Sequence, residues 1–149
     1  MTIRYKRPDK KNAESILDAA RSDMKFTLFT LKPTSESAST VVRNIYECFR
    51  MLGDALLVAK GIEAEDHVTS IKELMTLSVS TSRPIFLIDN LRKLRHNINY
   101  YGYKPTVLEA EDAVSLAKAC FEPLAQEVLK KIKESGNGSL PNSQKEQSF

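Results

Sequence analysis

The sequence predicts an all-α protein: an antiparallel bundle of four long helices and one short helix, followed by a disordered C-terminal tail. The 149 residues include 5 Gly and no Trp, and Ala, Leu, Lys and Glu are plentiful, which favours helix over sheet. Apolar residues recur at three- and four-residue steps along most of the chain, and no strand pattern of useful length is visible. Short connections between these segments predict antiparallel neighbours.

The first two predicted helices cover residues 9–31 and 35–60. Pro33 separates them because proline cannot continue a helix, and Thr34 or Ser35 can cap the second helix. Gly61 closes the second helix in the usual C-terminal position. The apolar stripes of the two helices consist of Ile16, Leu17, Ala20, Met24, Leu28 and Leu31, and of Val41, Ile45, Cys48, Phe49, Leu52, Leu56 and Ala59.

The next two predicted helices are a short one and a longer one. The short third helix starts after Asp66. We expect Ser82 to cap the fourth helix, with Pro84 in its first turn. Gly102 and Pro105 end this helix. Its apolar stripe consists of Ile85, Ile88, Leu91, Leu94 and Ile98.

The fifth predicted helix begins at a capping box and runs to about Lys133. Thr106 and Glu109 form the box, in which each side chain accepts a backbone N–H of the first turn. Pro123 lies inside the helix, so we expect a kink near residues 119–120. The bundle therefore occupies residues 9–134 as one domain. A basic N-terminal arm, residues 1–8, precedes it, and a polar tail, residues 135–149, follows it as a disordered segment.

Composition narrows the cellular context and the chemistry. No apolar run reaches the roughly 20 residues that span a bilayer, and no apolar segment follows the basic N-terminus as it would in a signal peptide. We therefore expect a cytoplasmic protein without a membrane partner. Cys48 and Cys120 lie among apolar residues, which predicts two buried thiols. The two His and the absence of a Cys-x-x-Cys motif predict neither a metal site nor a cofactor.

The segment LRHNINYYGY, residues 94–103, is unusual because Arg95 falls on the core-facing side of the fourth helix. A charge there is costly unless it is paired or lies at an interface. One hypothesis is that Arg95 reaches solvent at the core edge or pairs with Glu47 or Asp54 on the second helix. The other is that its planar guanidinium points into a groove or a subunit interface and binds an anion.

Neighbouring residues extend the second hypothesis. Between residues 90 and 108 the chain carries no acid and four basic residues, which are Arg92, Lys93, Arg95 and Lys104. The net charge of +3 leans weakly towards a nucleic-acid partner. His96 lies on the outer side of the helix, as polar surface or as a general acid or base. Tyr100, Tyr101 and Tyr103 either stack on bases and donate hydrogen bonds to phosphate, or one or two of them plug the end of the bundle.

With these residues in view, the chain resembles the HEPN domains of prokaryotes over residues 9–133. The mark of that family is an Arg and a polar residue, followed a few positions later by a His, near the end of a late helix. Arg95 and His96 match the Arg and the polar residue. Residues 46–61, YECFRMLGDALLVAKG, also look like the second helix of such proteins. At the position of the family His, the sequence has Tyr100, Tyr101 or Gly102 instead.

The resemblance implies a homodimer and a link to RNA. Catalytic members are metal-independent RNases in which the Arg binds the scissile phosphate and the His assists proton transfer from the ribose 2′-OH. Tyrosine is a poor base at neutral pH because its ordinary pKa is about 10. His96 points about 100° away from Arg95 on a straight helix. Family members also pair with minimal nucleotidyltransferases, often as toxin and antitoxin, and in some pairs a Tyr just past the motif is the target of nucleotidyl transfer. If Tyr101 replaces the family His, Tyr103 stands in that place; if Tyr100 does, Gly102 stands there and cannot serve.

We therefore expect a HEPN-type domain that binds RNA or a nucleotide and belongs to a toxin–antitoxin or nucleotidyltransferase-associated system. One alternative is an active metal-independent endoribonuclease that uses His96 or Tyr100. Another is a non-catalytic dimerisation module held together by Arg95 and Asn99. The candidate catalytic residues are Arg95, His96 and Tyr100. The candidate RNA- or nucleotide-binding residues are Arg92, Arg95, Asn99, Tyr101, Tyr103 and Lys104.

Overall fold

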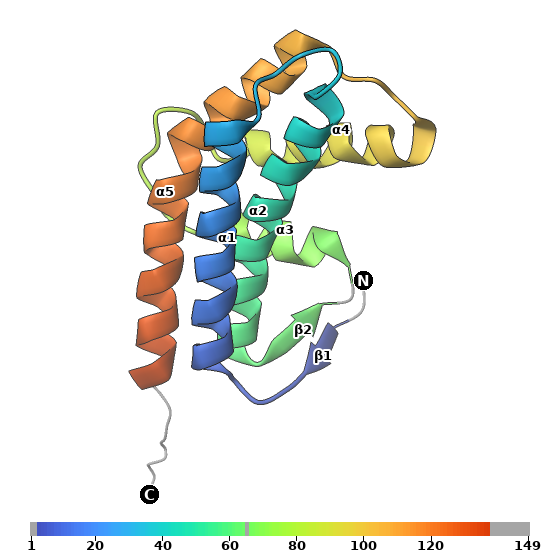
Figure 1. Cartoon of the computed structure of the whole chain (residues 1–149). Helices are drawn as coiled ribbons and strands as arrows, with labels where there is room; N and C mark the ends of the chain where they lie inside the picture. The colour runs from blue at the N-terminus through green and yellow to red at the C-terminus, as the bar shows by residue number, and fades with distance from the viewer. Residues whose placement is uncertain (1–2, 65, 138–149) are drawn as a thin grey trace, which may run out of the picture.

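The computed structural model describes residues 3–64 and 66–137, and this part of the chain is mostly helical (Figure 1). The elements in chain order are β1 (Ile3–Tyr5), α1 (Lys10–Thr30), α2 (Ala38–Lys60), β2 (Ile62–Ala64), α3 (His67–Met75), α4 (Leu87–Tyr101) and α5 (Val107–Asn137). The all-α class is therefore confirmed. The two short strands are an addition that the sequence pattern did not predict.

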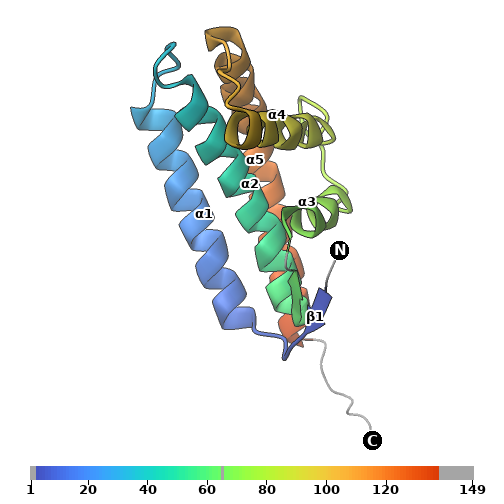
Figure 2. The same ribbon diagram turned by 90° about the vertical axis from the view of Figure 1, so that its right-hand side faces the viewer.

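Three long helices, α1, α2 and α5, run side by side, and α2 packs against both of the others. The shorter α4 instead crosses the upper end of this group (Figures 1 and 2). It packs on α2 through Ile88, Leu91 and Ile98, which are buried. The predicted antiparallel bundle of four long helices therefore differs from the structure at α4, whose crossing brings its last turns onto the first half of α2.

The core is centred on α2 because this helix has neighbours on several sides. Tyr46, Phe49 and Leu52 are completely buried there. Both cysteines are buried and free, as the sequence predicted. Burial raises the pKa of the Cys48 thiol to about 12, because the apolar surroundings disfavour the thiolate.

Most helix ends lie close to the predicted residues, but the predicted start of the second helix is wrong: α2 begins at Ala38, and neither Thr34 nor Ser35 caps it. Two helices begin at an aspartate cap. Asp9 caps α1 by accepting the Asn12 N–H at 3.0 Å, and Asp66 caps α3 by accepting the Thr69 N–H at 2.9 Å. Gly61 ends α2 with a φ of 77°, a left-handed conformation that glycine adopts at little cost. These local signals needed no knowledge of the tertiary structure.

The predicted start of α4 at Ser82 is wrong, because the helix begins at Leu87. Residues 84–88 first form a tighter turn, in which the Leu87 N–H bonds to the Pro84 carbonyl at 3.2 Å. Ser82 lies too far from the first helical turn to cap it, and no side chain caps the N-terminus of α4. Ser82 with Pro84 two residues later is a pattern common at helix starts. Here the turn that begins at Pro84 moves the start of the helix to Leu87.

The basic arm is tied to the bundle by a small antiparallel ladder that pairs β1 with β2. Ile3 lies opposite Ala64 and Tyr5 opposite Ile62, and the Lys6 N–H donates to the Gly61 carbonyl at 2.6 Å. Strands of three residues are too short to produce a readable alternation. Their pairing depends on the turn at Gly61, which returns the chain towards the arm.

The helix α5 starts at the predicted capping box. The Glu109 carboxylate accepts the Thr106 N–H at 2.9 Å, and the Thr106 hydroxyl accepts the Glu109 N–H at 3.0 Å. The helix contains Pro123 and changes direction partway along its length (Figure 1), as expected for an internal proline. It continues to Asn137, beyond the predicted end. The rest of the predicted tail lies outside the described residues.

The capping box predicts a pH effect on stability. The pKa of Glu109 is held below its ordinary value, first by the Thr106 N–H and also by hydrogen bonds from Tyr103 and Thr106. A lowered pKa in the folded state stabilises the protein above the ordinary value of 4.5, and this stabilisation is lost as the pH falls through the lowered pKa. We expect Glu109→Gln, which keeps an acceptor but cannot titrate, to flatten the decline in stability below pH 4.5.

The measurement is urea unfolding of both proteins from neutral pH down to about pH 3. At neutral pH the variant is expected to lose at most about 1 kcal/mol, the usual size of a capping contribution. If the free energies of unfolding of the wild type and Glu109→Gln fall in parallel on acidification, the pKa of Glu109 does not differ between the folded and the unfolded state, and the prediction is wrong.

Candidate functional site

Arg95 reaches from α4 to the ring of Tyr46 on α2. Its guanidinium carbon lies over the ring, 5.3 Å from the centroid, in a cation–π contact. Such contacts contribute about 0.5–2 kcal/mol, depending on how far the cation is desolvated. The contact holds Arg95 at the edge of the core. Because the guanidinium lies over a ring in this contact, its N–H donors are not used there in a hydrogen bond to oxygen. Arg95 as a whole is half-buried, so part of the side chain remains open to solvent.

A second bridge joins the same helices one turn further along. The Arg43 Nε on α2 donates to the Asn99 Oδ1 on α4 at 2.8 Å. Arg43 and Tyr46 are three residues apart on α2, and Arg95 and Asn99 are four apart on α4, so each pair lies on one helix face. The crossing of α4 over α2 thus places two arginines from distant parts of the sequence on one surface.

The expected ion pairs of Arg95 with Glu47 or Asp54 are made by a different residue. Arg50, which lies one turn further along α2 from Tyr46, forms ion pairs with both carboxylates. Its Nε donates to the Glu47 Oε1 at 3.0 Å. Glu47 and Asp54 thus pair with an arginine of their own helix. Side chains three and four residues apart on one helix are close neighbours, so they form such pairs without any contribution from another helix.

The predicted basic patch around Arg95 is partly neutralised at one end. The Arg92 Nε donates to the Asp89 carboxylate at 2.8 Å, and the Lys93 ammonium lies 3.6 Å from it. The pKa of Asp89 is lowered, mainly by the hydrogen bond from Arg92. Asp89 lies just before the acid-free stretch that the sequence analysis noted, so Arg92 has a carboxylate partner within its own helix.

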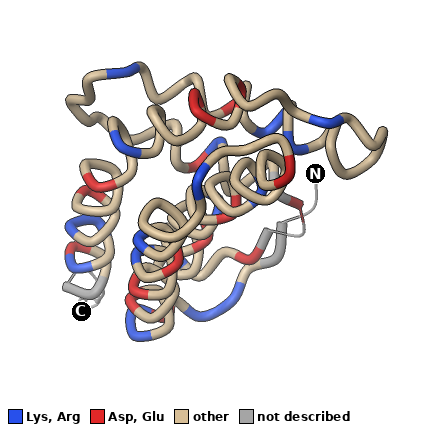
Figure 3. The backbone as a smooth tube through the Cα atoms, turned by 45° about the horizontal axis from the view of Figure 1, so that its top comes forward, with Lys and Arg blue, Asp and Glu red and all other residues tan. Residues whose placement is uncertain are grey.

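Tyr46, at the centre of this surface, lies among charges of both signs. Burial raises the pKa of its hydroxyl, Arg95, Arg92 and Arg50 act to lower it, and Glu47 acts to raise it. The three arginines therefore offset the effect of burial only in part, and the pKa of Tyr46 stays above its ordinary value. Figure 3 shows basic and acidic positions interspersed along the helices.

An exposed aromatic cluster follows on the last turns of α4. The His96 ring lies 4.6 Å from the Tyr100 ring and 5.7 Å from the Tyr101 ring, between ring centroids. Tyr100 and Tyr101 are 68% and 76% exposed, so neither of these two rings plugs the end of the bundle. Exposed rings at this spacing offer faces on which a nucleic-acid base can stack.

Tyr103 has a structural role in the turn between α4 and α5. Its hydroxyl donates to the Glu109 carboxylate at 2.7 Å, and this bond raises the pKa of Tyr103. Its backbone N–H bonds to the Asn97 carbonyl at 3.1 Å. Lys104 is exposed in the same connection. The structure thus brings Arg95, Asn99 and the His96 cluster together on α4 and leaves Tyr103 engaged with the start of α5.

Sequence reasoning missed Arg43 and Tyr46, which complete the surface from the α2 side. Their spacing on one face of α2 was readable, but only the crossing of α4 shows which face of α2 it covers. The described residues contain no group of three or more His, Cys, Asp and Glu side chains that could hold a metal ion. None of the helices in the described part of the chain combines the length and the apolar character that crossing a membrane requires.

Comparisons of the chain with protein-family models, curated proteins and solved structures found no match. The fold and the surface together define an all-helical protein with a basic and aromatic surface where α4 crosses α2. In chemical terms, this surface offers guanidinium donors for an anion and exposed rings for a flat aromatic ligand.

Proposed function

We propose that this chain is a HEPN-type domain that binds RNA or a nucleotide at the crossing of α4 over α2. Arg95 and Arg43 contact phosphate, and Asn99 is oriented for hydrogen bonding by Arg43. His96, Tyr100 and Tyr101 provide stacking faces for bases. The proposal rests on one observation above all: two arginines from different helices meet α4 or α2 at the crossing, and an exposed His–Tyr cluster occupies neighbouring positions of α4. Phosphate and base then have adjacent binding groups.

In this proposal the chain acts as a homodimer in a toxin–antitoxin or nucleotidyltransferase-associated system. Cleavage of RNA is weak or absent because a tyrosine takes the place of the family histidine. An active RNase is the second candidate, favoured by the exposed His96 ring that lies 4.6 Å from Tyr100. In that case His96 or Tyr100 moves the proton and Arg95 holds the scissile phosphate.

The test is binding and cleavage of a labelled single-stranded oligoribonucleotide in EDTA. We expect Arg95→Ala to weaken binding about tenfold, because it removes one charge-assisted contact to phosphate. Arg21→Ala is the matched control, since it removes the same charge from the α1–α5 face, where Arg21 pairs with Glu122 at 2.8 Å. This control is expected to bind as the wild type does.

The outcomes separate the candidates. Arg95-dependent binding without cleavage supports the binding proposal. Arg95-dependent cleavage in EDTA establishes the RNase instead. Equal affinity of Arg95→Ala and the wild type would contradict both, provided that circular dichroism shows both proteins folded.

A further inference from the structure

A groove of about 350 Å³ lies between α1 and α5, which pack side by side and run in opposite directions (Figure 1). Its floor is apolar: Met24 and Leu28 come from α1, and Ala117 and Phe121 come from α5. Leu28 is only half-buried, so part of this apolar surface faces solvent. Because both walls are helices, the groove follows their axes, and this shape suits another helix that lies along it.

The rim of the groove is basic. Arg21, Lys25 and Lys118 line it together with one acid, Glu122. Arg21 already uses this acid, because its Nη2 donates to the Glu122 Oε2 at 2.8 Å and its Nε donates to the Oε1 at 3.4 Å. Lys25 and Lys118 are exposed, and neither forms an ion pair with any residue in the described part of the chain. Each wall of the groove therefore carries one positive charge that is available to a partner.

A large apolar side chain beside the groove is almost fully exposed. Phe29 on α1 is 91% exposed. It follows Leu28 directly and lies one turn beyond Lys25 on the same side of the helix. Aromatic side chains supply much of the affinity of protein interfaces when a partner covers them. A small ligand confined to the groove would leave Phe29 in water, so its position favours a macromolecular partner.

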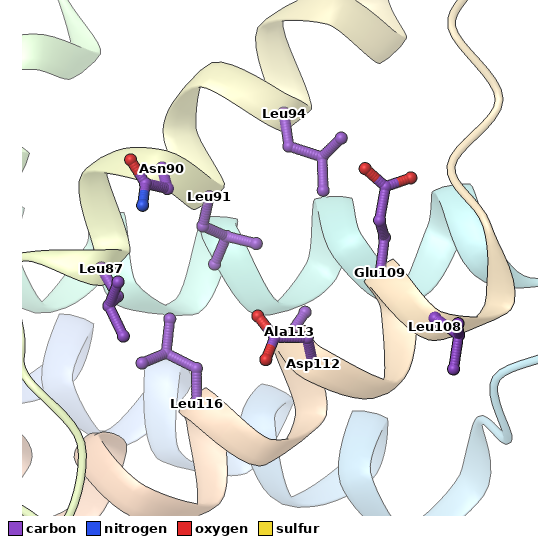
Figure 4. Close-up of a pocket in the computed structure, with 9 residues that line it drawn as sticks. All are labelled: Leu87, Asn90, Leu91, Leu94, Leu108, Glu109, Asp112, Ala113 and Leu116. Atoms are coloured by element: carbon purple, nitrogen blue, oxygen red, sulfur yellow. The ribbon is translucent and has the colours of Figure 1, made fainter.

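The apolar groove between α4 and α5 lacks these available charges. Figure 4 shows Leu91 on α4 and Leu116 on α5 among the side chains that line it. Its two acids both have partners: Glu109 belongs to the capping box of α5, and Asp112 lies 3.1 Å from Arg83. The α1–α5 groove is therefore the one of the two whose charges select a partner.

We propose that the α1–α5 groove binds an acidic amphipathic helix of a partner protein. Helices that dock in grooves place apolar side chains at positions i, i+3 or i+4, and i+7 on the floor. Asp or Glu residues beside that apolar stripe then face Lys25 and Lys118. RNA would match the two lysines but not the apolar floor, and a basic helix would match the floor but not the lysines. The groove lies on α1 and α5, so this inference does not depend on RNA binding at the crossing of α4 over α2.

Two synthetic peptides test the charge preference by fluorescence anisotropy. Each has about 18 residues, or five helical turns, with leucines on one face and either Glu or Lys on the flanks. We expect the wild type to bind the Glu peptide at least about tenfold more tightly, because the lysines of the groove repel the Lys peptide. Lys25→Glu/Lys118→Glu should reverse this preference. Lys10→Glu/Lys11→Glu is the matched control, because it changes the net charge equally at exposed positions at the start of α1, and it should keep the wild-type preference.

A third peptide tests the apolar contact. It keeps every glutamate of the Glu peptide but carries serines in place of the leucines. We expect its affinity to be lower by at least about tenfold, because it buries no apolar surface. In the protein, Phe29→Ala should weaken the Glu peptide by about tenfold. Phe86→Ala is its control, because this phenylalanine is 65% exposed and lies directly before α4, and it should bind as the wild type does.

A wild type that does not bind the Glu peptide would overturn the proposal. So would equal affinity for the Glu and serine peptides, which would mean attraction between charges alone, or a preference that Lys25→Glu/Lys118→Glu leaves unchanged. Displacement of the Glu peptide by a single-stranded oligoribonucleotide would assign the groove to nucleic acid instead. Peptide binding by Arg43→Ala/Arg95→Ala keeps the two proposals apart, because this variant retains the whole groove.

Discussion

Replacing Gly53 with alanine is expected to lower the free energy of unfolding by about 3 kcal/mol, at the upper end of the cost of overpacking. Gly53 lies inside α2 where α3 passes closest. A Cβ at this position would lie 2.1 Å from the Ser70 carbonyl oxygen and 2.6 Å from its carbonyl carbon. These are backbone atoms, which cannot rotate away as a side-chain end can. The two helices must therefore separate.

Helix propensity alone predicts the opposite result. Alanine is favoured over glycine inside a helix by about 1 kcal/mol, so a stabilised variant would be expected if α3 were absent. Separation of the helices would also disturb the Ser70 hydroxyl, which donates to the Asp54 carboxylate, and the packing of the buried Ile71 and Leu74. We expect the cost of the clash to exceed the gain in helix propensity, because a closely packed interior cannot easily move apart.

Urea unfolding of Gly53→Ala beside Gly102→Ala measures this effect. Gly102 has a φ of 66° but no atom within 4 Å of an added Cβ. Its replacement therefore tests the conformational cost alone, which is about 1 kcal/mol for a left-handed residue. A Gly53→Ala protein as stable as the wild type would show that α2 and α3 do not approach as closely as described.

The double variant Arg43→Ala/Arg95→Ala is expected to weaken binding of a single-stranded oligoribonucleotide about a hundredfold at low ionic strength, if each arginine contributes one charge-assisted phosphate contact. Loss of Arg43 also releases Asn99, whose carbonyl oxygen accepts the Arg43 Nε–H at 2.8 Å. The substitutions therefore remove the guanidinium donors from the crossing of α4 over α2 and leave the Asn99 side chain without the contact that orients it.

Salt dependence gives this prediction a second readout. Each lost phosphate contact should reduce the slope of log affinity against log salt by about 0.7 for a single strand. The double variant should therefore bind with a slope that is shallower by about 1.4. Arg21→Ala/Lys118→Ala is the matched control, because it removes two basic residues from the α1–α5 groove. If both double variants lose affinity equally, binding reflects net charge and not the α2–α4 surface.

The residues of the candidate site differ in how far the sequence predicted them. Arg95 was identified because a charge on the apolar side of a helix is costly without a partner. In the structure this partner is the ring of Tyr46. The exposed position of His96 was also predicted from helical periodicity. Arg43 gave no such signal, since an exposed arginine on a polar helix face is ordinary. Its place in the site depends on Asn99, which lies 56 residues away in the chain.

The sequence by itself determined the helices and most of their ends, because caps, the C-terminal Gly61 and the apolar stripes act within one or two helical turns. The Thr106–Glu109 box caps α5 as predicted. Asp9 and Asp66, where the sequence predicted that α1 and α3 begin, cap those two helices. The tertiary structure alone decided that α4 crosses α2 and that β1 pairs with β2. It also decided that Gly53 admits the backbone of α3. These features depend on contacts between segments distant in sequence, whose packing angles helical periodicity does not encode.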